Sequence, residues 1–170
     1  ASSLGKVKVK IHDNAGEHIL RDLPAGAPYL IDIAKYDGQW YAVAGAANEP
    51  KVYVYKNPVA ALGQNPDSAL VPATILKITA PEVLAFSANS QFIMAESGSS
   101  FAVYDIDNDR RYQYDTKLPL DGPLRAKWMD NARLTVVSGG KVAVFDYDGT
   151  NLQTLSATTV LPLFDKDYLN

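Results

Sequence analysis

The sequence predicts an all-β fold built from repeated four-stranded antiparallel units. The clearest unit spans residues 128–155, where three apolar, strand-like runs are separated by turn signals at 138–140 and 146–149. With the approach before Trp128 it forms a four-stranded unit of about 40 residues. Similar runs occur upstream, and no segment keeps a helical period.

The unit recurs along the chain. Phe86 and Trp128, two aromatic anchors, are 42 residues apart, and we predict that they occupy equivalent buried sites between neighbouring blades. The strand centres Val103 and Val144 are 41 residues apart. A third copy covers residues 37–55 and carries a longer loop after it. Residues 5–16 match the pattern of a half copy, a strand followed by a turn. A repeat at this period indicates an array of identical supersecondary units.

Two motifs resemble a known family. Residues 86–92, Phe-Ser-Ala-Asn-Ser-Gln-Phe, resemble the F-S-P-D-G-x-x turn of propeller blades of the WD-repeat-like, TolB-type class. Val103-Tyr104-Asp105 and Val144-Phe145-Asp146 resemble the third-strand ending of such blades. Ala88 replaces the usual proline, Ser90 the usual glycine, and no Trp-Asp pair ends a strand. The resemblance implies a propeller and a bacterial cell-envelope setting, and it carries no site.

We therefore predict a β-propeller-type array with about three complete blades and partial blades at both ends. Residues 1–170 form a single propeller or part of a larger one, with blades at about 4–23 (half), 29–79, 82–118, 122–156 and 158–170 (partial). Each blade buries two faces, so several must stack. Either the chain is part of a longer propeller, which we favour, or its two ends complete a small fourth blade. A β-sandwich or an up-and-down barrel is the rival architecture, and the matched spacing disfavours it.

The individual elements follow from local patterns. A hairpin over 4–23 comes first, followed by strands at 29–33, 40–44, 52–55 and 74–78, then at 83–86, 92–95, 101–104 and 111–114, with 160–164 starting a further blade. The 57–72 loop holds three prolines, which bar it from a central strand. We favour a tolerated insertion at a blade rim over a functional loop. Its Val-Ala-Ala-Leu run is too short for more than a single helical turn.

Composition limits the function classes. The chain has 47% apolar residues, a net charge of −3 and no cysteine. Disulfides, zinc-thiolate sites and cysteine nucleophiles are therefore excluded. Lys6, Lys8 and Lys10 alternate with apolar residues, which indicates the solvent face of a strand rather than a nucleic-acid stripe. No apolar run reaches the ~20 residues of a membrane span, so membrane insertion is not predicted.

Two aspartate-rich turns are candidate metal loops. Asp105, Asp107 and Asp109 alternate as calcium ligands do, but Arg110 stands where a calcium loop needs glycine. Asp146 and Asp148 repeat the pattern in the next unit. A feature at the same place in each blade favours a turn, because aspartate accepts hydrogen bonds from turn backbone.

The only two histidines flank one turn. If the hairpin pairs, His12 and His18 could approach each other beside Asp13 and Glu17 and form an incomplete metal site. A solvated hairpin tip is favoured. The polar turn at 97–100 lacks a nucleophile elbow, and no phosphate loop or dinucleotide motif is present. We predict no catalytic, cofactor-binding or metal-binding residues and no cofactor.

Two function hypotheses remain. The first is a non-catalytic binding or scaffold module in a bacterial cell envelope, extracytoplasmic or at the cell surface. It would use its loops to recognise a protein or glycan, or bind the remaining blades of a larger propeller. Its expected surface includes the 57–72 loop and exposed aromatics such as Tyr112 and Tyr114. The alternative is an accessory or gating propeller domain of a larger hydrolase.

Overall fold

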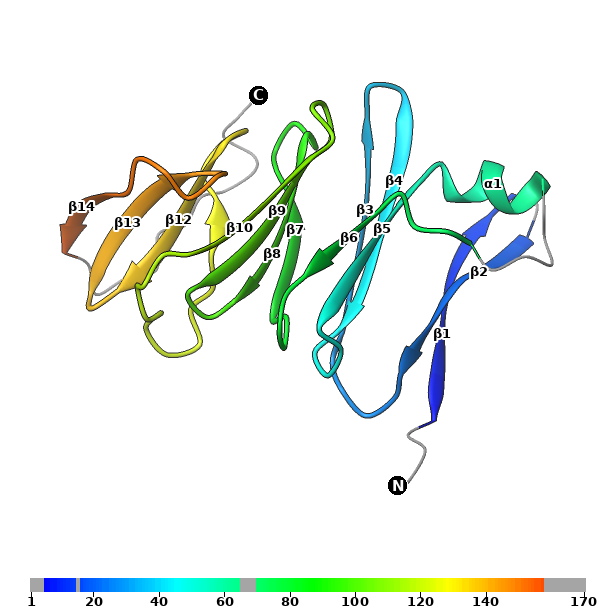
Figure 1. Ribbon diagram of the computed structural model, residues 1–170, viewed down its shortest axis with the longest axis horizontal. Helices are drawn as coiled ribbons and strands as arrows, with labels where there is room; N and C mark the ends of the chain where they lie inside the picture. The colour runs from blue at the N-terminus through cyan, green and yellow to red at the C-terminus, as the bar shows by residue number, and fades with distance from the viewer. Residues whose placement is uncertain (1–4, 15, 65–69, 158–170) are drawn as a thin grey trace.

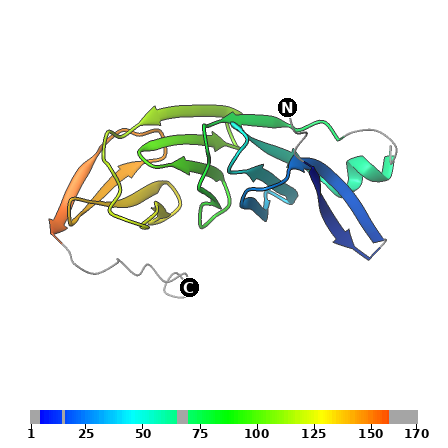
Figure 2. The same ribbon diagram turned by 90° about the horizontal axis from the view of Figure 1, so that it is seen from below.

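The computed structural model describes residues 5–14, 16–64 and 70–157. These residues form three four-stranded antiparallel sheets and one two-stranded hairpin, arranged side by side in chain order (Figure 1). Seen from below, the array follows an arc with the hairpin at one end and the last sheet at the other (Figure 2). The predicted all-β, propeller-type array of four-stranded blades is confirmed.

The strands fall into consecutive groups. The hairpin comprises β1 (Lys6–Asp13) and β2 (Gly16–Pro24). The first blade comprises β3 (Tyr29–Tyr36), β4 (Gln39–Ala46), β5 (Lys51–Lys56) and β6 (Thr74–Lys77). The second comprises β7 (Val83–Phe86), β8 (Phe92–Ser97), β9 (Ser100–Asp105) and β10 (Arg110–Asp115). The third comprises β11 (Lys127–Trp128), β12 (Arg133–Ser138), β13 (Lys141–Asp146) and β14 (Gln153–Ala157). The predicted strand at 160–164 and the partial blade at 158–170 lie outside the described residues.

Each blade runs from an inner to an outer strand in chain order. The inner strands β3 and β7 touch each other across neighbouring blades. The turn between β3 and β4 is as short as a hairpin permits, with Tyr36 paired to Gln39. Asp37 and Gly38 both have positive φ, 45° and 73°, the conformation that a two-residue hairpin turn requires.

One helix departs from the sequence prediction of at most a single turn. Helix α1 (Pro58–Gln64) follows β5 within the 57–72 segment. Pro58 takes the first helical position, where its missing N–H costs nothing. Leu62 is buried near the hairpin and β4. The helix therefore forms because tertiary packing buries its apolar side, which the local sequence does not reveal.

The core lies between the blades. Alternate residues of β8 face opposite neighbours: Ile93 and Ala95 pack toward the first blade, while Phe92 and Met94 pack toward the third. This alternation is the period of two expected of a strand with both faces covered. The hairpin packs on the other face of the first blade, where Leu23 is fully buried.

Phe86 and Trp128 occupy equivalent positions, each at the end of an inner strand. The prediction that both are buried is wrong, because each is only partly buried. An inner strand has a sheet neighbour on one side only, which leaves its end partly open. Trp128 still links two blades, since its indole Nε1–H donates to the carbonyl oxygen of Ala85 at 3.2 Å.

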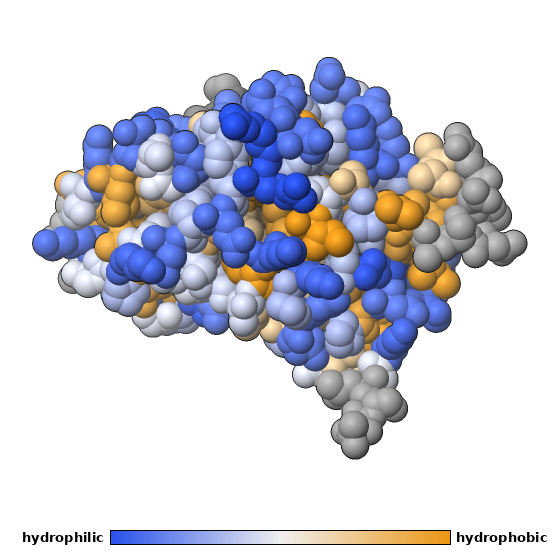
Figure 3. All heavy atoms as spheres, in the orientation of Figure 1, coloured by the Kyte–Doolittle hydropathy of each residue, from blue (hydrophilic) through white to orange (hydrophobic). Residues whose placement is uncertain are grey.

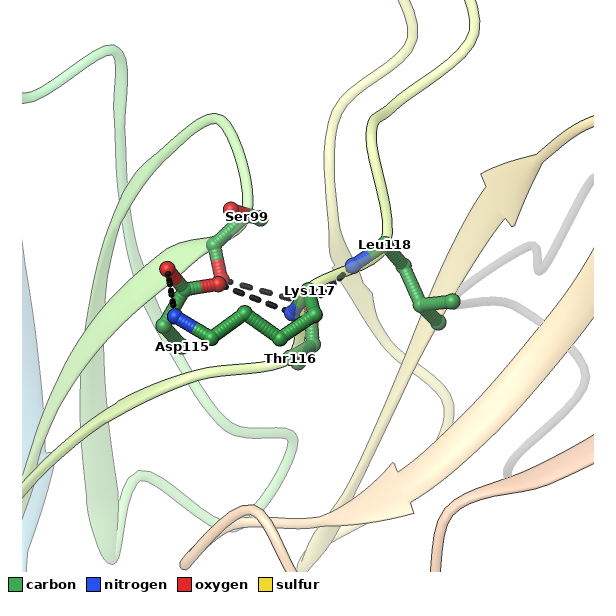
Figure 4. Close-up of polar contacts among 5 residues, drawn as sticks. All are labelled: Ser99, Asp115, Thr116, Lys117 and Leu118. Atoms are coloured by element: carbon green, nitrogen blue, oxygen red, sulfur yellow. Dashed lines mark hydrogen bonds and ion pairs between the residues drawn. The ribbon is translucent and has the colours of Figure 1, made fainter.

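The connector between the second and third blades is held by polar contacts at its start (Figure 4). The backbone N–H of Thr116 donates to the Ser99 carbonyl at 3.0 Å. The Asp115 carboxylate accepts the Lys117 N–H at 2.8 Å and pairs with its ammonium at 2.9 Å. The side-chain hydrogen bond from Lys117 is the main cause that lowers the pKa of Asp115 to about 2, and the Lys117 backbone N–H adds to it. The connector is thus fixed where it leaves β10.

Candidate functional site

The aspartate turn after β9 is a structural element. Asp105 is buried, and its carboxylate accepts the backbone N–H of Asp107 at 3.1 Å and the amide of Asn108 at 2.8 Å. Asp109 accepts the hydroxyl of Tyr104 at 2.9 Å. The carboxylates thus hold the turn and the end of the strand, as the hydrogen-bonding habits of aspartate in turns predict.

The equivalent turn of the third blade is held in a related way. Asp146 accepts the side-chain amide of Asn151 at 2.6 Å. Asp148 accepts the hydroxyl of Thr150 at 2.6 Å and its backbone N–H at 3.0 Å. Both oxygen-rich turns therefore share one local role, which is to close the hairpin beyond the third strand.

The two histidines cannot share a metal in this register. His12 pairs with Glu17, whereas His18 pairs with Ile11. Because directly paired residues share a face and successive residues alternate, His12 and His18 point to opposite faces of the hairpin. His18 instead lies 3.1 Å from the carboxylate of Asp13. Within the described ranges, no group of three His, Cys, Asp or Glu could hold a metal ion.

The lysines of β1 face solvent and two of them are paired. Lys8 lies 3.4 Å from Asp22, and Lys10 lies 2.5 Å from Glu17, across the hairpin. Their charges are therefore offset locally rather than presented as a basic stripe. No helix in the described part of the chain is long and apolar enough to cross a membrane.

Tyr112 and Tyr114 are not the exposed aromatics that the sequence suggested. Both are partly buried against the third blade. The Tyr114 ring stacks on Phe101 at 5.4 Å, and its hydroxyl donates to the Tyr147 carbonyl at 3.1 Å. Burial raises the pKa of the Tyr114 phenol. The outer strand β10 seals the gap between two blades, because Tyr112 and Tyr114 turn inward.

The structure shows a groove that sequence reasoning missed. We call it the rim groove. It has a volume of ≈ 290 Å³ and lies between the outer strands β6 and β10, lined by Ile75, Leu76, Lys77, Ala102, Arg111, Tyr112 and Gln113. In Figure 3, apolar residues over β6 lie beside strongly hydrophilic residues over β10 on this side of the molecule.

The two walls of the rim groove are strand edges. Each wall contributes three consecutive residues, and consecutive side chains of a strand point to opposite faces. The lining therefore includes main chain as well as side chains. Arg111 and Gln113 pair with Tyr104 and Ala102, which face the first blade. They consequently point from β10 toward β6, and the small Ala102 leaves the space between them.

Arg111 is the cation whose side chain points into the rim groove. It makes one long contact, 3.5 Å from its guanidinium to the Thr74 hydroxyl, and takes part in no ion pair with another described residue. Lys77 lines the groove with its main chain, because its side chain lies on the other face of β6, with that of Ile75.

Part of this groove could have been predicted from the sequence. Alternation places Arg111 and Gln113 on one face of their strand, with Ala102 opposite. The sequence does not predict the distance between β6 and β10, because those strands belong to different sheets and share no register.

The sequence analysis also did not identify a buried carboxyl group, that of Glu96. Glu96 has an exposed fraction of 0% and lies between the second and third blades. One of its oxygens accepts the backbone N–H of Ala126 at 3.0 Å, and the other, Oε1, has no hydrogen-bond partner among the described residues. Burial raises the pKa of this carboxyl, while the nearby charge of Arg125 acts in the opposite direction.

One sheet face is left open by the described residues. On β3, the side chains Ile31 and Ile33 are 57% and 50% exposed, beside Tyr29. Trp40 on β4 is 50% exposed. Register places Ile31 and Ile33 opposite Ala44 and Ala42, which lie under the hairpin. We call these four exposed side chains the open face. The two-stranded hairpin covers only the outer part of a sheet that a four-stranded blade would cover fully.

Comparisons with known proteins support the fold. No protein-family model matches this chain, and no curated protein matches it in sequence. Among solved structures, a protein from Bacteroides uniformis provisionally assigned as a 6-phosphogluconolactonase is similar, with a TM-score of 0.52 and 14% identity. The match covers 91% of this chain and 52% of that one.

Two further structures match less closely. A functionally unknown protein from Desulfotomaculum acetoxidans has a TM-score of 0.49 at 14% identity, with 94% of this chain and 52% of that one covered. The β-propeller domain of Myceliophteria thermophila Cps50 (Swd1) has a TM-score of 0.44 at 12% identity, with 79% and 45% covered. The chain thus spans about half the length of the structures it matches most fully. The likeness to the Bacteroides uniformis structure is one of fold alone.

Proposed function

We propose that this chain is a non-catalytic binding or scaffold module, and that the rim groove is its binding surface. The observation that carries the proposal is the combination of a preformed groove, an apolar floor, and the side chains of Arg111 and Gln113 that point into it. Binding sites commonly combine a concave apolar surface with a few polar groups that fix orientation. Blades packed on two faces hold these groups rigidly, so little ordering is needed on binding.

The proposal can be tested by mapping contacts in solution. Backbone amide NMR shifts would be recorded while fragments of envelope components, both peptides and glycans, are added. We expect the largest shifts at β6, β9 and β10. The assignment would be contradicted if the ligands changed the amide shifts of residues distant from the groove only. It would also be contradicted if no ligand changed the amide shift of any residue.

We further propose that the chain belongs to a larger propeller, in a bacterial cell envelope. The open face supports the first part, because β1 and β2 precede the first blade as the third and fourth strands of a blade would. The two inner strands of that blade would then cover Ile31 and Ile33. The TolB-type resemblance of residues 86–92 supports the second part.

The alternative is an accessory or gating domain of a larger hydrolase. One similar structure is provisionally assigned as a 6-phosphogluconolactonase, a likeness of fold alone. Under our proposal, the isolated chain has no 6-phosphogluconolactone hydrolase activity above the uncatalysed rate. A full-length reading frame with a catalytic domain downstream would favour the alternative, whereas further blades after a signal peptide would favour the envelope module.

A further inference from the structure

We infer that the open face is covered by an amphipathic β-strand that adds to the free edge of β1, with apolar side chains toward the first blade and polar side chains on the opposite side. This inference rests on the proposal of a larger propeller, which supplies the strand, and adds the chemistry of that strand. Three observations carry it: the open face continues an existing interface, β1 has a free edge, and β1 differs from the third strands of the complete blades.

The open face continues the interface between the hairpin and the first blade. Val9, Leu20 and Leu23 of the hairpin belong to one buried cluster with alanines of β4. Register places Ile31 and Ile33 of β3 directly opposite two of these alanines. The apolar surface therefore runs from the covered part of the sheet onto β3, where it is exposed. A contiguous exposed apolar surface of this kind marks an interaction site.

The apolar strip on β3 has a defined length. Tyr29, Ile31 and Ile33 lie on one face of the strand, because successive side chains alternate, and all three are exposed. Lys35, the next residue on that face, is also exposed and ends the strip. Its ammonium lies 6.0 Å from the centre of the Trp40 ring. A covering strand therefore needs apolar residues at alternate positions over a segment of about five to seven residues.

The edge of β1 specifies how the strand attaches. β1 pairs with β2 alone among the described residues, so its other edge presents unpaired backbone N–H and C=O groups. An extended peptide satisfies such groups by adding to the edge, which is a recurring mode of recognition. Because β1 and β2 hold the places of the third and fourth strands of a blade, a strand added to β1 takes the place of the second strand. It then lies on the side of the open face.

The residue pattern of β1 specifies the opposite side of the added strand. In the complete blades, the third strands β5, β9 and β13 each bury four consecutive apolar residues, at 52–55, 101–104 and 142–145. Such runs are expected where a strand is covered on both faces. β1 instead alternates, because Lys6, Lys8 and Lys10 are exposed on one face while Val9 is buried on the other. The blade that contains β1 therefore has a neighbouring blade on one side only.

A strand added to β1 shares these two faces. On one face its side chains meet Ile31 and Ile33, so apolar residues are favoured there. On the other face they lie beside the exposed lysines of β1 and meet solvent, so polar residues are favoured. Apolar residues on both faces would place a new apolar patch in water. A polar outer face is also typical of the terminal unit of a repeat array. The covering strand therefore alternates apolar with polar residues.

The test uses end-blocked heptapeptides built from valine and threonine. The first alternates Thr with Val, and the second has the same composition with its valines consecutive. Fluorescence anisotropy of labelled peptides would measure binding to the 170-residue chain at a concentration at which the chain is monomeric. We expect the alternating peptide to bind at least about tenfold more tightly than the second.

Two further peptides test whether the ligand binds as an added strand. Both repeat the alternating sequence, one with N-methyl groups on its valine amides and the other with N-methyl groups on its threonine amides. Because successive N–H groups of a strand point to opposite edges, only one of the two forms should lose binding, by at least about tenfold. Hydrogen exchange of the β1 amides should slow when the alternating peptide binds.

Substitutions assign the contact to the open face. The double variant Ile31→Lys/Ile33→Lys should weaken binding of the alternating peptide at least about tenfold, since a buried charge needs a partner. The matched control is Leu152→Lys/Leu155→Lys, because these two leucines are 45% and 56% exposed and lie at the other end of the array. The control should leave the affinity within about twofold. Circular dichroism would confirm that both variants keep the fold.

The outcomes separate the two proposals. If the peptide with consecutive valines binds equally well, the alternating pattern is overturned while the larger propeller stands. If both N-methylated forms bind normally, or if exchange at β1 does not slow, addition to the edge of β1 is overturned. If no peptide binds and the chain also stays monomeric at every concentration, both the inference and the proposed larger propeller fail.

Discussion

Gly149 lies against the Tyr114 ring, where the second and third blades meet. A side-chain carbon at this position would lie 2.6 Å from the Tyr114 ring, and its backbone φ is +84°. Both steric room and left-handed backbone therefore require glycine here. The Tyr114 side chain in turn seals the outer part of the interface.

We predict that Gly149→Ala lowers the free energy of unfolding by about 2–4 kcal/mol, combining overpacking with backbone strain. Gly98→Ala is the control, since Gly98 also has positive φ, +57°, but no atom lies within 4 Å of the added carbon. It should cost only the backbone strain, about 1–2 kcal/mol. Urea denaturation would measure the free energy of unfolding of both variants. An equal decrease in the two would show that the Tyr114 ring does not clash with an added side-chain carbon at position 149.

Glu96 makes the stability depend on pH. Because burial raises its pKa in the folded chain, the protonated form favours folding. This contribution is fully present below the ordinary pKa of glutamate and is lost as pH rises through the raised value. The loss is at most about 1.4 kcal/mol for each pH unit between the two values.

We predict that Glu96→Gln removes this decline, because the amide cannot ionise. Urea denaturation between pH 4 and 8 would compare the two proteins. The unchanged chain should lose stability relative to the variant as pH increases. A parallel pH dependence of both proteins would mean that folding does not raise the pKa of Glu96.

At the level of elements, the short strand β11 relies on its tryptophan. Trp128 is half-buried, donates to Ala85 at 3.2 Å and stacks on Phe92 at 6.0 Å. Because burial is partial, we expect Trp128→Ala to cost about 2–3 kcal/mol rather than the ~3–5 kcal/mol of a fully buried tryptophan. The chain has two tryptophans, and Trp40 is half-exposed.

Trp40→Ala therefore serves as the matched control and should cost less than about 1 kcal/mol. Thermal or urea unfolding followed by circular dichroism would compare the two variants. Similar losses would indicate that the cross-blade contacts of Trp128 contribute little to the packing of β11 against the second blade.

At the scale of the whole molecule, the open face decides how the array behaves alone. Contiguous exposed apolar side chains mark interaction sites. We predict that the isolated 170-residue chain self-associates through Tyr29, Ile31, Ile33 and Trp40. Sedimentation velocity over a range of concentrations would detect this association as a sedimentation coefficient that increases with concentration. In a Trp128→Phe background, Trp40 emission should move to shorter wavelength on association.

The double variant Ile31→Lys/Ile33→Lys should weaken association at least about tenfold, since charge cannot be buried without a partner. Val71→Lys is the control, because Val71 is 83% exposed but lies before β6 rather than on the open face. A chain that stays monomeric at every concentration would show that the face tolerates water without a covering blade.

The sequence by itself determined the strands, their turns and their repetition. These features are local. Apolar residues alternate with a period of two, and turn residues such as Asp37 and Gly38 separate the strands. The unit recurs about every 40 residues, which can be seen without knowing any distant contact. The aspartates at 105 and 146 could also be assigned to turns, because a carboxylate that accepts from its own turn needs only neighbouring residues.

Only the tertiary structure decided what meets between the blades. The alternation of apolar residues predicts that a strand has two buried faces. It does not predict which neighbouring blade covers each face or how closely that blade packs. Tyr112 and Tyr114 therefore turned out packed, Glu96 buried, and His12 and His18 on opposite faces of a bulged hairpin. The rim groove arises from the gap between β6 and β10, two strands of different sheets that no hydrogen-bond register connects. Such gaps depend on how blades stack, which is a non-local property of the chain.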